Sequence, residues 1–433
     1  MKHSRMMMTA AVTSLAVLAA CGSSKTASPA TTAASTTAAA TTAAATTAAG
    51  TTAVATTAVA TTAAATTAAA TTAAPAPPSS VGKGEGALAI VAWAGYAENG
   101  SNDPKVDWVK PFEDKTGCKT TVKVGATSDE MVQLMRTGDY DGVSASGDAT
   151  LRLIASGDVA PVDTSFVPNY ADISSFLKMQ QYNSKDGKAY GIPHGWGANY
   201  LMWNTAVVKT DPDSWSVVFD KASPYKGKVT AYDAPIYIAD AAVYLMASKP
   251  ELKITNPYAL DDTQFKAAVD LLKGQKTIVG EYWSDYLKAQ AAFDQGSTVL
   301  GTTWQVIKGL VDTDAKVKVK TVIPKEGATA WSDTWMLSSK SKHPNCMYLW
   351  MNYITSPEVQ AQVAEYFGEA PANPKACGFT QAKDHCDTYK ATDEAFHKQL
   401  FYWTTPTKDC LDGRGSICVA FSDWQKAWTD IKG

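Results

Sequence analysis

The sequence predicts an α/β protein built around parallel sheets. Two observations support this fold class: from about residue 87 onward short apolar runs alternate with amphipathic helical patterns, and two stretches of this kind follow each other along the chain. Strand–helix–strand units of this type have right-handed crossovers and place their strands parallel. Ligands bind such sheets beyond the carboxyl ends of the strands, so a site is expected there.

The first α/β unit begins at residues 88–92, an apolar run typical of a buried strand, which leads directly into Trp93 and Tyr96. Gly117 is expected to end the next helix, and Ser128 to open the one after it. The predicted elements after the first strand are a helix at 105–115, a strand at 120–124, a helix from Ser128, a strand at 140–145 and a helix near Asp148. This βαβαβ order predicts a parallel sheet.

The second α/β unit follows the same plan. Extended segments are predicted at 189–193, 198–203, 228–232, 298–303 and 317–324, and helices at 215–221, 237–247, 262–273 and 284–295. A longer helical region at 342–367 is interrupted at Ser356-Pro357, because proline lacks the N–H that a helix interior needs. The tail from Asn373 onward is rich in loops and closes with an amphipathic helix at 422–431.

The N-terminus is typical of export. Charged Lys2 and Arg5 precede an apolar run that ends in L-A-A-C at Cys21, which resembles a bacterial lipoprotein signal. The resemblance implies that residues 1–21 are the signal, that Cys21 is lipidated, and that the protein is extracytoplasmic and anchored to the bacterial cell membrane by lipid. An ordinary cleaved signal with a chance cysteine is the alternative. Residues 22–86, mostly Ala and Thr, lack core-forming side chains and are predicted to be a disordered tether.

Charge and motifs exclude several function classes. The formal net charge is −3, and residues 1–84 hold four basic residues and no acidic one, so the folded part is more acidic than the whole chain. An acidic body argues against nucleic acid as a partner. The chain also lacks a G-x-S-x-G nucleophile elbow and a phosphate-binding G-x-x-x-x-G-K-[ST] loop, and only His194 lies near a predicted cleft. We therefore expect no catalytic residues and no cofactor.

Six cysteines follow Cys21, and an even number in an exported chain suggests disulfides. Short spacings favour the pairs Cys377–Cys386 and Cys410–Cys418, which leaves Cys118–Cys346 as a long-range pair. Six cysteines allow fifteen pairings, so the connectivity stays open. A zinc site is the competing interpretation, but no C-x-x-C pair is present and the histidines are scattered, so no metal is expected.

Aromatic residues are abundant, with 13 Trp and 18 Tyr. Several stand at predicted strand ends or in turns flanked by glycine: Trp93, Tyr96, Trp196, Trp304, Trp331 and Trp403. Any one of them could simply fill the core. Together with the nearby acids Asp148, Asp233, Asp333 and Glu369, however, they suit recognition of ammonium groups by cation–π contacts and charge-assisted hydrogen bonds.

The chain from about residue 87 to its end resembles the spermidine/putrescine-type solute-binding proteins of ABC importers. The matching motifs are W-A-G-Y-A-E-N-G from Trp93, Y-D-G-V-S-A-S from Tyr140, Y-G-I-P-H-G-W-G-A-N from Tyr190, K-G-K-V from Lys226, T-T-W ending at Trp304, P-K-E-G-A-T-A-W-S-D from Pro324 and S-P-E-V-Q from Ser356. Further motifs, and the cysteines at Cys118, Cys346, Cys377 and Cys386, resemble one branch of this family whose ligand is less settled.

This resemblance implies a two-lobed periplasmic-binding-protein fold of type II, with the ligand cleft between the lobes. The first lobe would comprise residues 87–197 and 333–374, and the second 198–332 and 375–433. The family's aromatic pair carries over to Trp93 and Tyr96, which would sandwich the ligand. Its other ligand residues carry over to Ser146, Trp304, Trp331 and Asp333, whose carboxylate would take an amine. The partners implied are a small amine and the permease subunits of an ABC transporter, with the binding protein acting as a monomer.

The chain departs from the family pattern at its acids. Where polyamine binders have D-D-A-R-E, this chain has Asp233-Ala234-Pro235-Ile236-Tyr237, and Asp148 and Glu369 stand where tyrosines are usual. The ligand could thus be a polyamine such as putrescine or spermidine. It could also be an amino-carboxylate such as 4-aminobutyrate, whose carboxylate the helix N-terminus at Ser128 would receive. An exported enzyme using the same cleft, or a surface adhesion protein, are the other readings.

Overall fold

The computed structural model describes residues 80–433, and every structural statement below refers to them. The predicted signal, Cys21 and most of the predicted tether lie outside the described residues. Within the described range, no helix combines the length and the apolar character that crossing a membrane requires.

The first half of the sheet contains three parallel strands, as the sequence predicts. β1 (Ala87–Ala92) lies in the middle and pairs in parallel with both β2 (Lys119–Val124) and β3 (Gly142–Ala145). The helices of this half are α1 (Val109–Thr116), α2 (Ser128–Thr137) and α3 (Gly147–Ser156). Thr127 is the N-cap of α2, since its side chain accepts a hydrogen bond from the N–H of Glu130.

The second half repeats this arrangement. β8 (Val229–Tyr232) lies between β9 (Val279–Trp283) and β10 (Leu300–Trp304), and all three strands are parallel. Its helices are α4 (Ser216–Phe219), α5 (Ile238–Ser248), α6 (Asp262–Gln275), α7 (Tyr286–Gln295) and α8 (Gln305–Asp314). Of these elements, the sequence reasoning missed β9 and α8 and placed the others within a few residues; it also predicted no strand at 328–338, where the structure has one.

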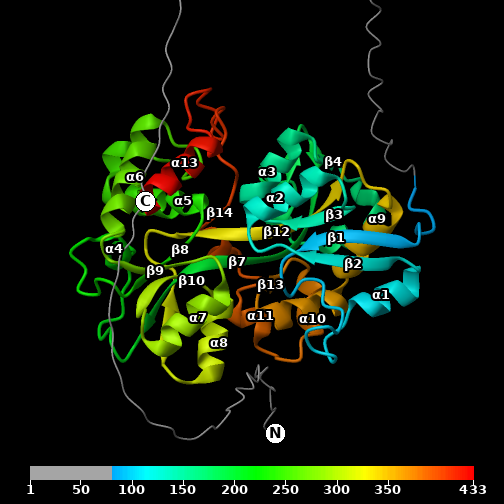
Figure 1. The fold of residues 1–433 in the computed structure, drawn as a ribbon, viewed down its shortest axis with the longest axis horizontal. Coiled ribbons are helices and arrows are strands. Elements are labelled where there is room, and N and C mark those ends of the chain that lie inside the picture. The colour runs from blue at the N-terminus through cyan, green and yellow to red at the C-terminus, as the bar shows by residue number, and fades with distance from the viewer. Residues whose placement is uncertain (1–79) are drawn as a thin grey trace, which may run out of the picture. The chain divides into compact units, whose positions relative to one another are not determined.

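Two long antiparallel strands join the halves (Figure 1). β7 (Gly191–Asn204) pairs with β12 (Ala328–Ser338) along its first part, and with β10 and β11 (Val319–Val322) along its second part. β12 in turn pairs with β3. The strand order is therefore β2-β1-β3-β12-β7-β10-β8-β9, a single sheet that passes through both halves.

The sequence predicted two short extended segments, at 189–193 and 198–203, where the structure has the single strand β7. Gly195 and Gly197 suggested a break in the sequence pattern, but both lie within β7. Neighbouring side chains occupy the space that a side chain at either position would need. A Cβ atom at Gly195 would lie about 2.1 Å from the carboxyl carbon of Glu369, and one at Gly197 about 2.5 Å from the Trp331 ring. The glycines thus allow the side chains of Glu369 and Trp331 to approach the strand.

The C-terminal part of the chain returns to both halves. α9 (Pro344–Ile354) and α10 (Pro357–Phe367) are separated at Pro357, as predicted, and α10 leads into β13 (Ala370–Pro371), which pairs with β7. β14 (Leu400–Tyr402) pairs in parallel with the start of β12, and α13 (Phe421–Lys432) closes the chain. The remaining short elements are β4 (Val159–Ala160), β5 (Ser184–Lys185), β6 (Lys188–Ala189), η1 (Thr164–Phe166), η2 (Pro168–Asp172), η3 (Ser175–Leu177), η4 (Pro235–Tyr237), η5 (Pro250–Leu252), η6 (Pro374–Gly378), α11 (His385–Thr388) and α12 (Glu394–His397).

All three expected disulfides are present: Cys118–Cys346, Cys377–Cys386 and Cys410–Cys418. The first joins Cys118, the residue before β2, to Cys346 in α9, and 228 positions separate the two in sequence. The segment that precedes β1 lies against the same place, because both carboxylate oxygens of Glu85 accept hydrogen bonds from the first turn of α9. The end of the predicted tether is therefore attached to the first half.

Candidate functional site

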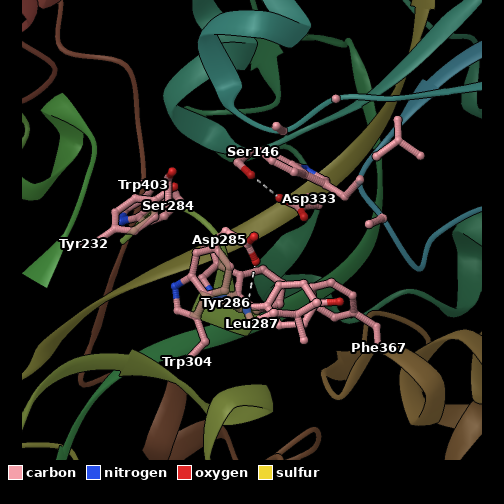
Figure 2. Close-up of a pocket in the computed structure, with 16 residues that line it drawn as sticks. Ser146, Tyr232, Ser284, Asp285, Tyr286, Leu287, Trp304, Asp333, Phe367 and Trp403 are labelled. Carbon is pink, nitrogen blue, oxygen red and sulfur yellow. Dashed lines mark hydrogen bonds between the residues drawn. The ribbon is translucent and has the colours of Figure 1, made fainter. Parts of the chain in front are cut away.

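A cavity of about 310 Å³ lies where the two halves of the sheet meet (Figure 2). Its lining comes from the carboxyl ends of all six parallel strands. The residues at or just after these ends are Trp93 (β1), Gly125 and Ala126 (β2), Ser146 (β3), Tyr232 (β8), Ser284 (β9) and Trp304 (β10). The topology predicts a ligand site at this position, because parallel strands of both halves end there and neither half covers the ends alone.

The lining is aromatic and acidic. It contains seven aromatic rings, two carboxyl groups and no Lys, Arg or His. The aromatic residues are Trp93, Tyr232, Tyr286, Trp304, Trp331, Phe367 and Trp403, and the acids are Asp285 and Asp333. Aromatic faces attract cations through their quadrupole, and a carboxylate supplies the opposite charge. The lining therefore suits a small ligand that carries ammonium groups on an apolar chain.

The aromatic rings of the second half hold one another in place. Tyr232 stacks on Trp403 with ring centroids 5.4 Å apart, and Trp304 packs edge to face against Trp283 at 4.9 Å. Trp304 also contacts Tyr232 and Trp331. Because each ring is fixed by its neighbours, this wall is formed before any ligand arrives.

Asp333 is the most deeply buried acid of the lining, with 4% of its surface exposed. It lies at an irregularity in the pairing of β12 with β7. Ser146 donates a hydrogen bond to Oδ1, and the hydroxyl of Tyr96 lies 2.8 Å from Oδ2. Burial raises the pKa of Asp333 to about 7, although these hydrogen bonds oppose the shift. An ammonium group beside Asp333 would favour its charged form.

Asp285 is the second acid of the lining and comes from the other half. It is the N-cap of α7, where its side chain accepts a hydrogen bond of 2.9 Å from the N–H of Leu287. Figure 2 shows both carboxyl groups, of Asp333 and Asp285, among the lining side chains. A ligand with two ammonium groups would find a carboxyl group on each half.

Tyr96 lies behind the cavity wall and not on it. The sequence paired it with Trp93 as a stacking residue, but it is 0% exposed and absent from the lining. Gly95 has φ +93°, so the chain turns there and directs Tyr96 inward between Phe367 and His194. Its hydroxyl contacts Asp333 and, at 2.7 Å, Oε2 of Glu369. In this conformation Tyr96 touches the acids instead of a ligand.

Five further residues singled out from the sequence also lie outside the lining. Glu369 is buried beneath Tyr96, and Asp148 is buried and accepts a hydrogen bond of 2.9 Å from Ser128. Asp233 is bonded to Lys432 and to the indole of Trp428. Trp196 packs against Phe176, and Tyr237 accepts a hydrogen bond from Gln275. Of the predicted residues, the cavity brings together Trp93, Ser146, Trp304, Trp331, Asp333 and Trp403.

The sequence reasoning missed several lining residues, namely Ala94, Val124, Gly125, Ala126, Tyr232, Ser284, Asp285, Tyr286, Leu287 and Phe367. The stretch 284–287 was assigned to a helix, because β9 before it was not identified. Tyr232 could have been found, since it is the last residue of a strand that was predicted correctly. Among the described residues, no group of three or more metal-ligating side chains occurs.

Two sheet halves joined by two long strands, with a ligand cavity built by both, define a two-lobed solute-binding protein of the periplasmic type. The comparison with known families agrees. The family model described as bacterial extracellular solute-binding protein matches residues 107–385, and this chain belongs to that family.

Curated relatives and solved structures give the same picture. The putrescine-binding periplasmic protein PotF of Escherichia coli is 25% identical over 69% of this chain and 83% of its own length. A putrescine/cadaverine-binding protein of Pseudomonas aeruginosa is 24% identical over 80% of this chain and 95% of its own. The structure of the spermidine/putrescine substrate-binding protein PotD of Streptococcus pneumoniae superposes with a TM-score of 0.62 at 18% identity, covering 80% of this chain and 99% of its own. These matches confirm the predicted family and the two-lobed fold.

Proposed function

We propose that this protein captures a small polyamine, such as putrescine or spermidine, outside the cell membrane and delivers it to the permease of an ABC importer. One observation carries the proposal: the cavity combines seven aromatic rings with two carboxyl groups and no basic side chain. Its volume of about 310 Å³ is at the small end of ligand pockets, which typically span about 300–1,000 Å³. The polyamine-binding relatives support the same ligand class.

An amino-carboxylate such as 4-aminobutyrate is less well matched. Its carboxylate would find no cationic partner, because no Lys, Arg or His lines the cavity. The helix N-terminus at α2 is already occupied, since Thr127 caps it and Ser128 donates to Asp148. The two charged groups of the lining are carboxylates, which repel the carboxylate of 4-aminobutyrate. This compound is therefore the natural negative control.

Capture would proceed by closure of the two lobes. We propose lobes of residues 87–197 with 333–374 and 198–332 with 375–433, with the hinge in β7 and β12, where β7 changes its partner from β12 to β10. η6, which begins at Pro374 and runs past the proposed boundary, still packs against α10 of the first half. Asp333 and Asp285 lie on opposite walls, so a ligand that binds both stabilises the closed state selectively.

Delivery would occur from a membrane-anchored position. We propose that residues 1–21 are a lipoprotein signal, that Cys21 carries the lipid, and that residues 22–86 tether a monomeric body to the membrane. The L-A-A-C motif and the attachment of Glu85 to α9 support this arrangement, because a tether fixed to the first half leaves the second half free to move. Mass spectrometry of the membrane fraction would show an acylated N-terminal peptide beginning at Cys21.

A thermal-shift panel tests the ligand class. A ligand raises the melting temperature only through preferential binding to the folded state. Putrescine, cadaverine or spermidine should raise it in a concentration-dependent way, whereas 4-aminobutyrate and 1,4-butanediol should not. Butanediol has the length of putrescine without its charges. An equal shift of the melting temperature by both compounds would therefore show that the acids do not contribute to binding. Turnover of the ligand during incubation would instead favour an exported enzyme.

A further inference from the structure

Glu369 is a buried acid that the proposed ligand does not touch. It precedes β13, is 1% exposed and lies outside the cavity lining. The strand beside it has a glycine at position 195, where any side chain would overlap the carboxyl group of Glu369. The fold therefore leaves room for this carboxyl group, although burying a carboxylate without a cation costs free energy.

The hydrogen bonds around Glu369 impose a proton count. The hydroxyl of Tyr96 lies 2.7 Å from Oε2 of Glu369 and 2.8 Å from Oδ2 of Asp333. A phenol has one O–H and can donate only once. For both contacts to be hydrogen bonds, one of the two acids must carry a proton on the oxygen that faces Tyr96.

The surroundings decide which acid carries it. Asp333 also accepts from Ser146 and borders the cavity, where a cation would bind. Glu369 has neither a second donor for its side chain nor a cation among the described residues. Its other oxygen, Oε1, lies 3.7 Å from Nε2 of His194, and neither of these two atoms has a hydrogen-bond partner in the described part of the chain.

Other titratable groups of the described residues also face this cluster. The groups that face the cluster are His194 from β7, Asp148 from α3 and the ring of His385, which contacts the backbone oxygen of Glu369. Arg152 faces Asp148 and not Glu369. Burial lowers the pKa of His194 to about 3, so the ring is neutral, and burial raises the pKa of Glu369 well above its usual range.

We propose that Glu369 keeps its proton at neutral pH and acts as a positioning residue for Asp333: Glu369 donates to Tyr96, and Tyr96 donates to the ionised carboxylate that receives the ligand. This inference rests on the proposed function for the role of Asp333. This relay is the chain of hydrogen bonds from Glu369 through Tyr96 to Asp333. The O–H groups of Glu369 and Tyr96 both point toward Asp333, so the ligand-free site presents one negative charge at this end instead of two.

The relay also narrows the ligand class. With Glu369 neutral, the charges offered by the cavity lining are those of Asp333 and Asp285, one on each half. Two carboxylates match the two ammonium groups of a diamine. Extending the ligand by a third ammonium group would leave that group without a carboxylate among the lining residues, so putrescine or cadaverine should bind more tightly than spermidine.

A ligand-free experiment tests the proton directly. Urea unfolding of the full chain, wild type and Glu369→Gln, is measured from pH 6 to pH 8.5. If folded Glu369 keeps its proton, wild type must take up a proton on folding that the unfolded chain lacks. The unfolding constant of wild type relative to Glu369→Gln then rises about tenfold per pH unit across this window. A ratio independent of pH would show that Glu369 is ionised and would overturn the proposal.

The role of the relay is tested with putrescine by calorimetry over the same pH range. Glu369→Gln retains a donor toward Tyr96 and should bind within about threefold of wild type at pH 7.5; a larger loss contradicts the proposal. Tyr96→Phe removes a donor from Asp333, so the pH at which affinity is half-maximal should move upward by half a unit or more. A purely structural tyrosine would lower affinity equally at every pH. If wild type binds no amine, the proposed function fails while the unfolding test still decides on the proton.

Discussion

The two walls of the cavity are built differently. The wall of the first half contains one buried carboxyl group, that of Asp333, which accepts hydrogen bonds from the hydroxyl groups of Ser146 and Tyr96. The wall of the second half is a set of aromatic rings, including Tyr232, Trp304 and Trp403, that pack on one another. The first wall supplies the buried charge, and the second supplies a rigid apolar surface beside the more exposed acid Asp285, so a cation with an apolar chain needs both walls, and closure brings them together.

Loss of the charged wall should have the largest effect. Asp333→Asn keeps the shape of the side chain but removes its charge, and we expect putrescine affinity to fall at least about 30-fold, the scale of losing one partner of a buried charge pair. Calorimetry at pH 8 measures this. Asp233→Asn is the matched control, because Asp233 is bonded to Lys432 outside the cavity and its loss should change affinity less than threefold.

The same substitution should stabilise the protein without ligand. Because burial raises the pKa of Asp333 to about 7, the folded protein binds a proton between about pH 4 and pH 7 that the unfolded chain releases. Stability is therefore lost as the pH rises through this window, and above pH 7 the protein carries the whole cost. Asp333→Asn should raise the melting temperature most above pH 7 and hardly at pH 4. An unchanged difference at all pH values would contradict the raised pKa.

The pH dependence of binding follows from the same group. An ammonium ligand requires the ionised form of Asp333, so affinity for putrescine should be constant above about pH 8 and fall roughly tenfold per pH unit well below pH 7. Titrations from pH 5.5 to pH 8.5 check this. Asp333→Asn should lose most of this dependence, and a wild-type affinity that rises toward acidic pH would be incompatible with a carboxylate receptor.

Loss of the aromatic wall should have an intermediate effect. Trp304→Leu keeps an apolar side chain but removes the ring, and we expect affinity to fall about tenfold, within the range of cation–π contacts in desolvated sites. Trp304→Phe retains a ring and should lose less. If Leu and Phe at this position bind putrescine equally well, the wall acts by shape alone.

The smallest effect is expected for the second acid. Asp285→Asn should keep the cap of α7, since asparagine is an equally good N-cap residue, and so preserve stability. We expect a loss of about threefold to fivefold for putrescine and none for butylamine, the scale of a partly solvated ion pair. Comparison of the two amines isolates the contribution of the second ammonium group. An equal loss for both would place Asp285 outside the binding site.

The sequence was informative where the site depends on local order along the chain. Trp93 and Trp304 were predicted because each stands at the end of a recognisable strand, where parallel sheets bind ligands, whereas Ser146 was implied by the family resemblance. The orientation of Tyr96 was not predictable, since it depends on the positive φ of Gly95 and on the distant His194. Local patterns reveal neither.

Long-range contacts account for the other differences. Asp233 stands at a strand end like a ligand residue, but Lys432, 199 positions later, binds it. β9 was missed because its sequence, V-G-E-Y-W, includes Gly280 and Glu281 in a short run and so lacks a clear strand pattern, and the loop with Asp285 was missed with it. The fold class, the disulfides and the half of the site that follows strand ends were thus readable, whereas residues fixed by distant partners were not.

The buried acid of one wall and the aromatic rings of the other are proposed to hold a polyamine together. The most direct test of this proposal is calorimetric titration of the full chain with putrescine at pH 8, carried out in parallel on wild type and Asp333→Asn. We expect one saturable site in wild type, a loss of at least about 30-fold in the variant and no heat from 4-aminobutyrate. Absence of binding by any amine in wild type, or equal affinity in the two proteins, would contradict it.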